Sequence, residues 1–177
     1  MKVKNISAGI AGIFLFVAAG LPQSAVAKEI EMNLRFAGAF VTSMGLPSAL
    51  IHATGKGSPG KVEIRGYGGV DAFGGFPTEC LGSTGSFVQI NILENPLVFK
   101  FQDLSMLFAK NGNGIICISM TTGLIHFEIN LMFGGGRGRF EGATGTAVIT
   151  GEAEAVNVAQ TFLAETGTIV GTIIVPD

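Results

Sequence analysis

Hydrophobic and polar residues alternate with a period of two along much of the chain. The clearest example is 29–36 (EIEMNLRF), and the same alternation returns at 61–65, 88–92, 125–133 and 168–175. Because successive side chains of a β-strand point to opposite faces, this period indicates strands that each have one buried face.

Turn-forming residues separate these runs, for example at 56–60 (KGSPG) and 94–96 (ENP). Asn and Gly at 111–114 (NGNG) supply positive φ angles, which predicts a hairpin between strands at 104–109 and 115–120. Breaks every 8 to 12 residues or so are typical of an all-β sandwich or barrel, and we predict about eight or nine strands.

The segment 152–165 (EAEAVNVAQTFLAE) is ambiguous. It contains good helix formers, but also Val156, Val158, Thr161 and Phe162, and it has no clear helix cap. We predict a strand and a loop here, with a short helix as the alternative.

The first 27 residues have the layout of a cleaved signal peptide. Lys2 and Lys4 precede an uncharged apolar run at 8–21, and the tripeptide 25–27 (AVA) offers the small residues that signal peptidase needs. A membrane anchor is the disfavoured alternative, because this run is shorter than the roughly 20 residues that span a bilayer. We predict cleavage after Ala27 and export of residues 28–177 to the periplasm or the cell exterior.

Composition and charge limit the classes of protein to which this chain can belong. Hydrophobic residues make up 47% of the chain and charged residues 14%, which excludes a disordered, charge-rich chain. The formal net charge is −2 with Lys and Arg scattered along the sequence, so we predict no nucleic-acid partner. After the signal peptide no apolar run is long enough for a membrane-spanning helix, and we predict no span in the mature chain.

Cys80 and Cys117 are the two cysteines of the chain. In an exported protein an even pair indicates a disulfide, and two buried thiols are the alternative. Together with the distant His52 and His126, these cysteines match no familiar zinc-ligand spacing. We therefore predict a disulfide, no metal site and no cofactor.

Two exported β architectures fit the strand pattern. An outer-membrane barrel needs aromatic girdles, which a chain with no Trp and one Tyr cannot build in the usual way. A barrel that closes on itself removes exposed strand edges and suits an apolar chain better. We predict a single all-β domain at 28–177, a closed antiparallel barrel of about eight strands, which is just wide enough to be filled by side chains or to hold one small ligand.

A glycine-rich segment at 133–145 (FGGGRGRFEGATG) follows a predicted strand. It resembles the GGTGRFxGATG stretch of bacterial secreted proteins related to the dirigent and allene oxide cyclase barrels, with Gly136 where those proteins have Thr. The resemblance implies an antiparallel eight-stranded barrel, often with a cavity for apolar ligands and sometimes trimeric. It places no catalytic residue in this segment.

The same segment also has a physical interpretation. Its glycines permit tight bends, positive φ angles and close approach of strands, and we expect Phe140 to plug the core. A dinucleotide-binding loop is disfavoured, because Glu141 replaces the third glycine of that motif and a strand follows. The predicted fold-motif residues are Gly134, Gly135, Gly136, Gly138, Phe140, Gly142 and Gly145.

Two pairs of polar residues are the candidates for ligand binding: Glu63 with Arg65, and His126 with Glu128. The members of each pair are two residues apart, so they share one face of a strand. Inside the barrel, the first pair would orient the polar end of a ligand and the second would serve as an acid/base pair. We favour the alternative that both pairs face solvent, and we assign no catalytic residue.

The Phe residues have two roles open to them. They either line a pocket for a lipophilic ligand or form a dry packed core, and we favour the packed core. The residues concerned are Phe87, Phe99, Phe101, Phe108, Phe127, Phe133 and Phe140.

The sequence therefore favours an exported, non-enzymatic module that binds a small apolar ligand or a protein partner, with homo-oligomers left open. One alternative is a cofactor-free cyclase or isomerase acting on an apolar substrate, which requires a polar group inside the barrel. Another is a structural secreted oligomer, which predicts a filled barrel and a large apolar outer patch.

Overall fold

The computed structural model describes residues 27–42, 49–69, 71–156 and 162–177. The predicted signal peptide lies outside these residues, apart from Ala27. No helix in these ranges is long and apolar enough to cross a membrane. The elements are β1 (Lys28–Thr42), β2 (Ala49–Ser58), β3 (Val62–Gly68), β4 (Asp71–Gly75), β5 (Glu79–Cys80), β6 (Ser83–Thr84), β7 (Phe87–Ile92), β8 (Leu97–Phe101), β9 (Met106–Ser119), β10 (Ile125–Arg137), the 3-10 turn η1 (Gly138–Phe140), β11 (Thr144–Ala155) and β12 (Phe162–Val175).

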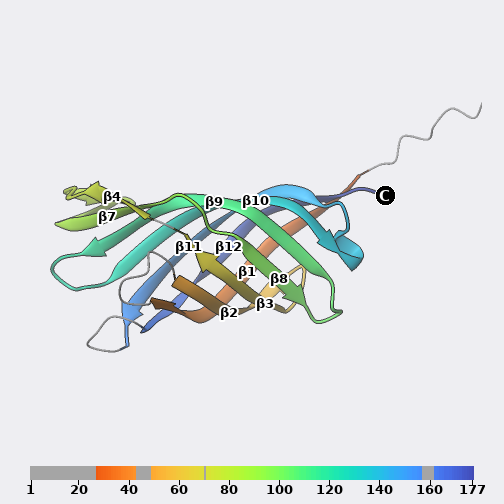
Figure 1. Ribbon diagram of the computed structural model, residues 1–177, viewed down its shortest axis with the longest axis horizontal. Coiled ribbons are helices and arrows are strands. Elements are labelled where there is room, and N and C mark those ends of the chain that lie inside the picture. Colours follow the sequence, from red (N-terminus) through yellow and green to blue (C-terminus); the bar gives the residue numbers. More distant parts are fainter. Residues whose placement is uncertain (1–26, 43–48, 70, 157–161) are drawn as a thin grey trace, which may run out of the picture.

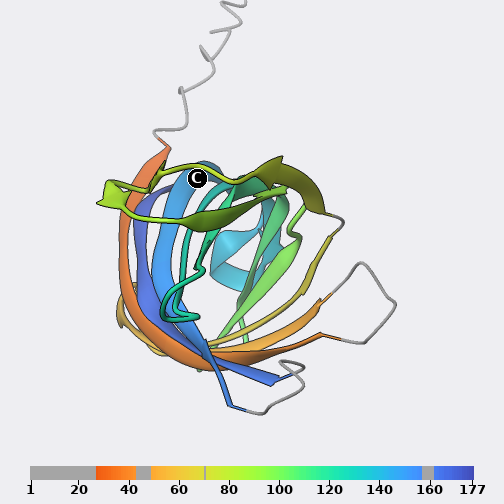
Figure 2. The ribbon, with the colours of Figure 1, turned by 90° about the vertical axis from the view of Figure 1, so that its left-hand side faces the viewer.

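Eight of these strands form a closed antiparallel barrel (Figure 1). The sheet runs in the order β10-β11-β12-β1-β2-β3-β8-β9, and β9 pairs again with β10 to close the ring. Figure 2 looks into one end of this ring and shows η1 lying across the other end. The prediction of an all-β fold with one closed antiparallel barrel of about eight strands is confirmed.

The alternation of the sequence decides which side chains fill the barrel. In β1, the side chains of Met32, Leu34 and Phe36 are buried, and the polar residues between them are exposed. β3 and β8 repeat this pattern. Of the seven Phe residues considered above for a pocket or a packed core, five belong to the main core: Phe99, Phe101, Phe127, Phe133 and Phe140.

The hairpin predicted at 111–114 is wrong, because β9 runs through these residues without turning. Neither Gly112 nor Gly114 has a positive φ angle. Gly114 allows a close approach of strands instead, since a Cβ atom there would lie 2.1 Å from the backbone oxygen of Glu128 on β10. Asn-Gly pairs have more than one structural use, and here close strand packing decides.

The continuous β9 extends the sheet beyond one end of the barrel (Figure 1). Its first half pairs with β8, and its second half pairs with β7, which in turn pairs with β4. A disulfide between Cys80 and Cys117 attaches the short β5–β6 hairpin to β9, with 6.1 Å between the two Cα atoms. The predicted disulfide is confirmed.

The glycine-rich segment makes the connection from β10 through η1 to β11. Gly135, Gly138, Gly142 and Gly145 all have positive φ angles, as a segment with repeated bends requires. Phe140 is 0% exposed, and its ring centroid lies 4.8 Å from that of Phe101.

The ambiguous segment at 152–165 is strand wherever the structure describes it, apart from the single residue that follows β11. β11 extends to Ala155, and β12 begins at Phe162. The intervening 157–161 lie outside the described residues.

Candidate functional site

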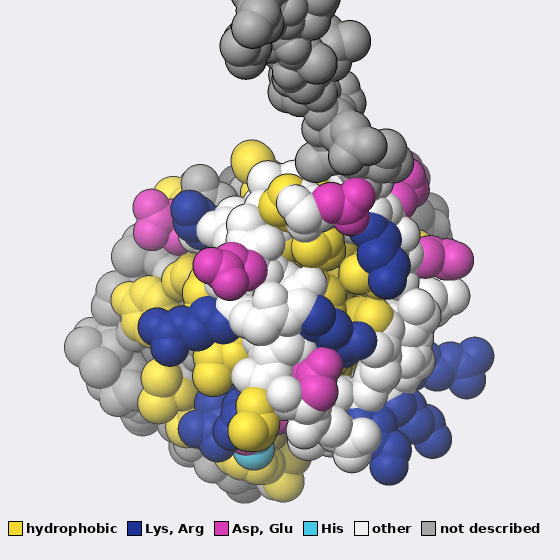
Figure 3. Space-filling model, turned by 90° about the vertical axis from the view of Figure 1, so that its right-hand side faces the viewer, with side chains coloured by type: hydrophobic (Ala, Val, Ile, Leu, Met, Phe, Trp, Pro, Cys, Tyr) yellow, Lys and Arg dark blue, Asp and Glu magenta, His cyan; other side chains and the backbone are white. Residues whose placement is uncertain are grey.

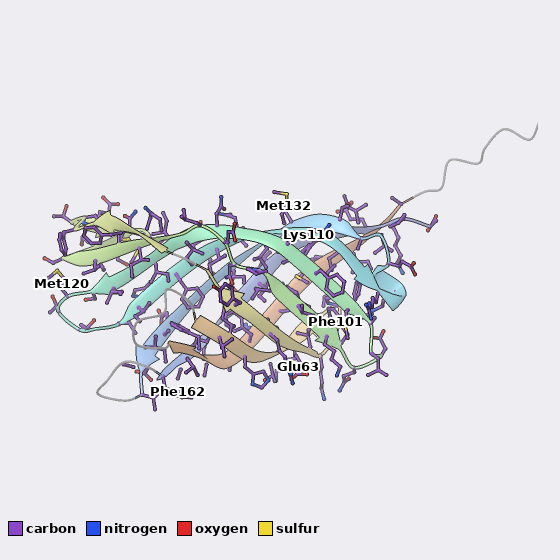
Figure 4. All side chains as sticks on the ribbon, in the orientation of Figure 1. Glu63, Phe101, Lys110, Met120, Met132 and Phe162 are labelled. Carbon is purple, nitrogen blue, oxygen red and sulfur yellow. A yellow bond between two sulfur atoms is a disulfide. The ribbon has the colours of Figure 1, made fainter. Side chains whose placement is uncertain are left out.

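Glu63 and Arg65 lie on the outer face of β3, because Val62 and Ile64 take the buried positions of that strand. Glu63 Oε1 accepts hydrogen bonds from Arg65 Nε at 2.8 Å and from Arg65 Nη2 at 2.6 Å. His52 Nε2, from β2, lies 3.1 Å from the same oxygen. Arg65 and then His52 hold the pKa of the Glu63 carboxyl below its ordinary value. Oε1 of Glu63, whose side chain points away from the barrel (Figure 4), is therefore already in hydrogen bonds with its neighbours.

His126 and Glu128 lie on the outer face of β10, with Phe127 buried on the opposite face. His126 Nδ1 lies 3.4 Å from a carboxylate oxygen of Glu152 on β11. Since β8 and β9 separate β3 from β10 in the sheet, the structure does not bring the two candidate pairs into one site.

A groove of about 710 Å³ lies over β1, β2, β3 and β8, toward the end of the barrel that carries η1. Figure 3 faces this end and shows Lys and Arg side chains interspersed with hydrophobic ones. The groove is lined by Arg35, Phe36, Ala37, Thr54, Gly55, Lys56, Lys61, Val62, Glu63, Lys100, Phe101, Gln102 and Leu104.

Cations dominate the polar part of this groove. We call Arg35, Lys56, Lys61 and Lys100 the basic cluster; none of them forms an ion pair with any residue that the structure describes. Arg35 stands directly opposite Lys56 in the β1–β2 register. Like charges in such cross-strand positions destabilise a sheet, so an anion bound beside them is favoured.

The turn between β8 and β9 forms one rim of the groove and carries an exposed leucine. Leu104 is 72% exposed and has a φ angle of 65°, which is uncommon for a residue other than Gly, Asn or Asp. Its amide donates to the Phe101 carbonyl at 3.0 Å, and the Phe101 amide donates to the Ser105 carbonyl at 2.9 Å. Backbone hydrogen bonds thus hold an apolar side chain in water at the edge of the groove.

Arg139 fixes this turn from the side of η1. Its guanidinium lies 4.7 Å from the ring centroid of Phe140 and 4.9 Å from that of Phe101, and its Nε lies 3.1 Å from Asp103 Oδ2. A hydrogen bond from Ser105 is the main cause that lowers the pKa of Asp103. Arg139 is therefore a paired structural residue, and it does not belong to the basic cluster.

The barrel interior holds a cavity of about 30 Å³, which is room for a water molecule and little more. Glu165 and Asn95 line this cavity; the first is 8% exposed and the second 1%. Burial raises the pKa of Glu165 to about 7. Asn95 Oδ1 has no hydrogen-bond partner among the described residues. Glu165 comes from β12 and Asn95 from the segment between β7 and β8, and the other residues that line the cavity are hydrophobic.

Sequence reasoning missed Glu165, although a signal for it was present. Ile169 and Ile173 share one face of the last alternating run, and steps of two residues back from Ile169 reach Gly167 and then Glu165. A charged residue was thus predictable on the buried face. The basic cluster left no such signal, because its members come from neighbouring strands whose register the sequence does not show.

Searches against protein-family models, curated proteins and solved structures find no match for this chain. The described residues contain no group of three or more His, Cys, Asp or Glu placed to hold a metal ion. The site must therefore be interpreted from its own geometry, which offers cations beside the exposed Leu104.

Proposed function

We propose that this protein is an exported, non-enzymatic binding module that binds an anionic partner in the groove on the outside of its barrel. The observation that carries the proposal is the contrast between two spaces. The outer groove of about 710 Å³ has the size of a small-molecule site, whereas the interior cavity has about 30 Å³. Binding on the outer face requires no rearrangement of the packed core.

Two features support export. The Cys80–Cys117 disulfide is typical of proteins that fold in an oxidising compartment, and residues 1–27 have the layout of a signal peptide. The resemblance of 133–145 to secreted dirigent-like and allene oxide cyclase barrels is a further argument of the same kind.

Titration with the fluorescent anion 1-anilinonaphthalene-8-sulfonate tests the proposal. We expect saturable binding that weakens at high salt, because exposed charges are screened. The triple variant Lys56→Gln, Lys61→Gln, Lys100→Gln should lose most of this binding. Lys110→Gln is the matched control, since Lys110 lies outside the groove (Figure 4). Equal binding by wild type and the triple variant, or no saturable binding by wild type, would contradict the proposal.

A second candidate is the cofactor-free cyclase or isomerase, and Glu165 is the observation that favours it. A carboxyl group with a pKa of about 7 inside an apolar barrel has the property of a general acid or base. This candidate requires the cavity beside Glu165 to enlarge for a substrate. Native mass spectrometry tests this candidate, which requires an apolar molecule to be released on denaturation. An activity assay with that molecule should then show a changed rate of turnover for the Glu165→Gln variant.

A further inference from the structure

We infer that the ligand of the outer groove is a single-chain amphiphile with one anionic head, a molecule of the chemical class of a long-chain carboxylate. This inference rests on the proposed function and names the ligand class for the same groove. It follows from three features: the basic cluster, the apolar surface beside it and the charge of the rest of the chain.

The basic cluster supplies the site for the head. Arg35 and Lys56 face each other across β1 and β2, so an anion between them relieves a like-charge contact. Lys100 lies opposite Glu63 in the β3–β8 register and its charge helps to lower the pKa of that carboxyl, but the hydrogen bonds to the carboxylate come from Arg65 and Lys100 forms no ion pair with it. The cations of the cluster are therefore available to a ligand.

The apolar surface beside the cluster supplies the site for the tail. Leu104 projects from the rim of the groove with 72% of its surface exposed, and Ala37 is exposed on the outer face of β1 beside Arg35. The side chains of Phe36, Val62 and Phe101 point into the barrel core, so only the outward-facing side chains of the groove can contact a tail. Leu104 carries an apolar side chain on backbone that favours Gly or Asn, at a position with no core to join. Contact with a hydrocarbon chain gives this leucine a role that packing within the chain does not.

The charge of the whole chain favours a small anion over an extended anionic surface. Asp and Glu number 13 against 11 Lys and Arg, while the groove gathers cations around a single carboxylate, Glu63. A polyanion or an anionic bilayer would extend beyond the groove and meet the acidic remainder of the surface. A single head group meets only the basic cluster.

Calorimetric titration of the purified, disulfide-bonded protein tests the inference with three probes: decanoate below its micelle concentration, butyrate, and decanol below its solubility limit. Decanoate should bind with one site, and butyrate and decanol should each bind at least about tenfold more weakly, because each lacks half of the contacts. Lys56→Gln with Lys100→Gln should weaken decanoate binding by about tenfold. Lys110→Gln should leave it unchanged.

Leu104→Asn separates a binding role from a structural one. Asn tolerates positive φ, so this variant should melt at the wild-type temperature or above it, while decanoate binding weakens severalfold and butyrate binding is unchanged. A lower melting temperature with unchanged decanoate affinity would overturn the role assigned to Leu104.

The remaining outcomes distinguish this inference from the proposed function. Equal affinities for decanoate and butyrate, or binding to anionic phosphatidylglycerol vesicles without binding of free decanoate, would overturn the inference. The sulfonate probe would still bind at the basic cluster in either case, so the proposed function would stand. If the wild-type protein shows no saturable binding of the sulfonate probe, both the proposed function and this inference are wrong.

Discussion

Glu165 is the residue whose chemistry departs most from its surroundings. Its neighbours across the sheet are Gly38 on β1 and Ala153 on β11, which are small enough to leave space for a carboxyl group inside the barrel. Burial disfavours the charged form, so the pKa rises from 4.5 to about 7. At neutral pH this carboxyl therefore exchanges between a protonated and an ionised form in the core.

The raised pKa predicts how stability changes with pH. The unfolded chain ionises Glu165 near pH 4.5 and the folded chain near pH 7, so the folded state binds more protons between these values. Its contribution to stability is full below the unfolded pKa and is lost as the pH rises through 7. Above both values the loss is about 3 kcal/mol.

Replacing Glu165 by Gln should remove this dependence. We expect the Glu165→Gln variant to match wild type in urea denaturation near pH 4 and to exceed its free energy of unfolding by up to about 3 kcal/mol near pH 9. Glu128→Gln, at an exposed position on β10, is the control. A constant difference between the Glu165→Gln variant and wild type across this range would show that Glu165 ionises normally in the fold.

At the scale of single elements, the β10–η1–β11 connection depends on backbone geometry more than on side chains. Gly145 has a φ angle of 134°, and a Cβ atom there would lie 2.1 Å from the backbone oxygen of Thr172 on β12. Gly135 has a φ angle of 109° with open space around it. A comparison of alanine substitutions at these two positions therefore distinguishes the cost of backbone strain from the cost of a steric clash.

Gly145→Ala should destabilise the protein by more than about 3 kcal/mol, because strain and clash add, whereas Gly135→Ala should cost about 1 kcal/mol from strain alone. Thermal denaturation of both variants measures the difference. Equal losses would mean that β11 and β12 separate easily at this point, against the close pairing that the barrel shows.

The disulfide is the covalent link between the β5–β6 hairpin and the barrel. Replacing both Cys80 and Cys117 by Ser should lower the free energy of unfolding by about 4 kcal/mol in the chain-entropy account, given a loop of this length. Hydrogen exchange should accelerate first in β5, β6 and β7 and remain slow in β1 and β12. Uniform acceleration over all strands would contradict a local role for the link.

The strands and their buried faces were predictable wherever the alternation of hydrophobic and polar residues is regular. The alternation in 29–36 and 125–133 identifies β1 and β10 and their buried faces, because a one-residue shift would expose every hydrophobic side chain. The course of the chain at 111–114 was not predictable, because Asn-Gly pairs fit both a hairpin and a close strand contact. Only the pairing of β9 with β10 distinguishes them.

At the scale of the whole molecule, the order of strands in the closed sheet brings together charged residues that are far apart in the sequence. A formal net charge of −2 with scattered cations suggests no binding surface along the sequence. The β1-β2-β3-β8 order then brings Arg35, Lys56, Lys61 and Lys100 around one groove. The sequence therefore predicts the barrel but not this cluster, since the cluster depends on the register of neighbouring strands.

A ligand that binds outside the barrel at the basic cluster must contact the lysine side chains there, and NMR of these side chains detects that contact. Reductive methylation with ¹³C-labelled formaldehyde gives each lysine a signal and keeps its charge. On titration with decanoate, we expect the signals of Lys56, Lys61 and Lys100 to shift together, while those of Lys28 and Lys110 do not. If decanoate binds by calorimetry but leaves all of these signals in place, the ligand lies elsewhere and the basic cluster is not its binding site.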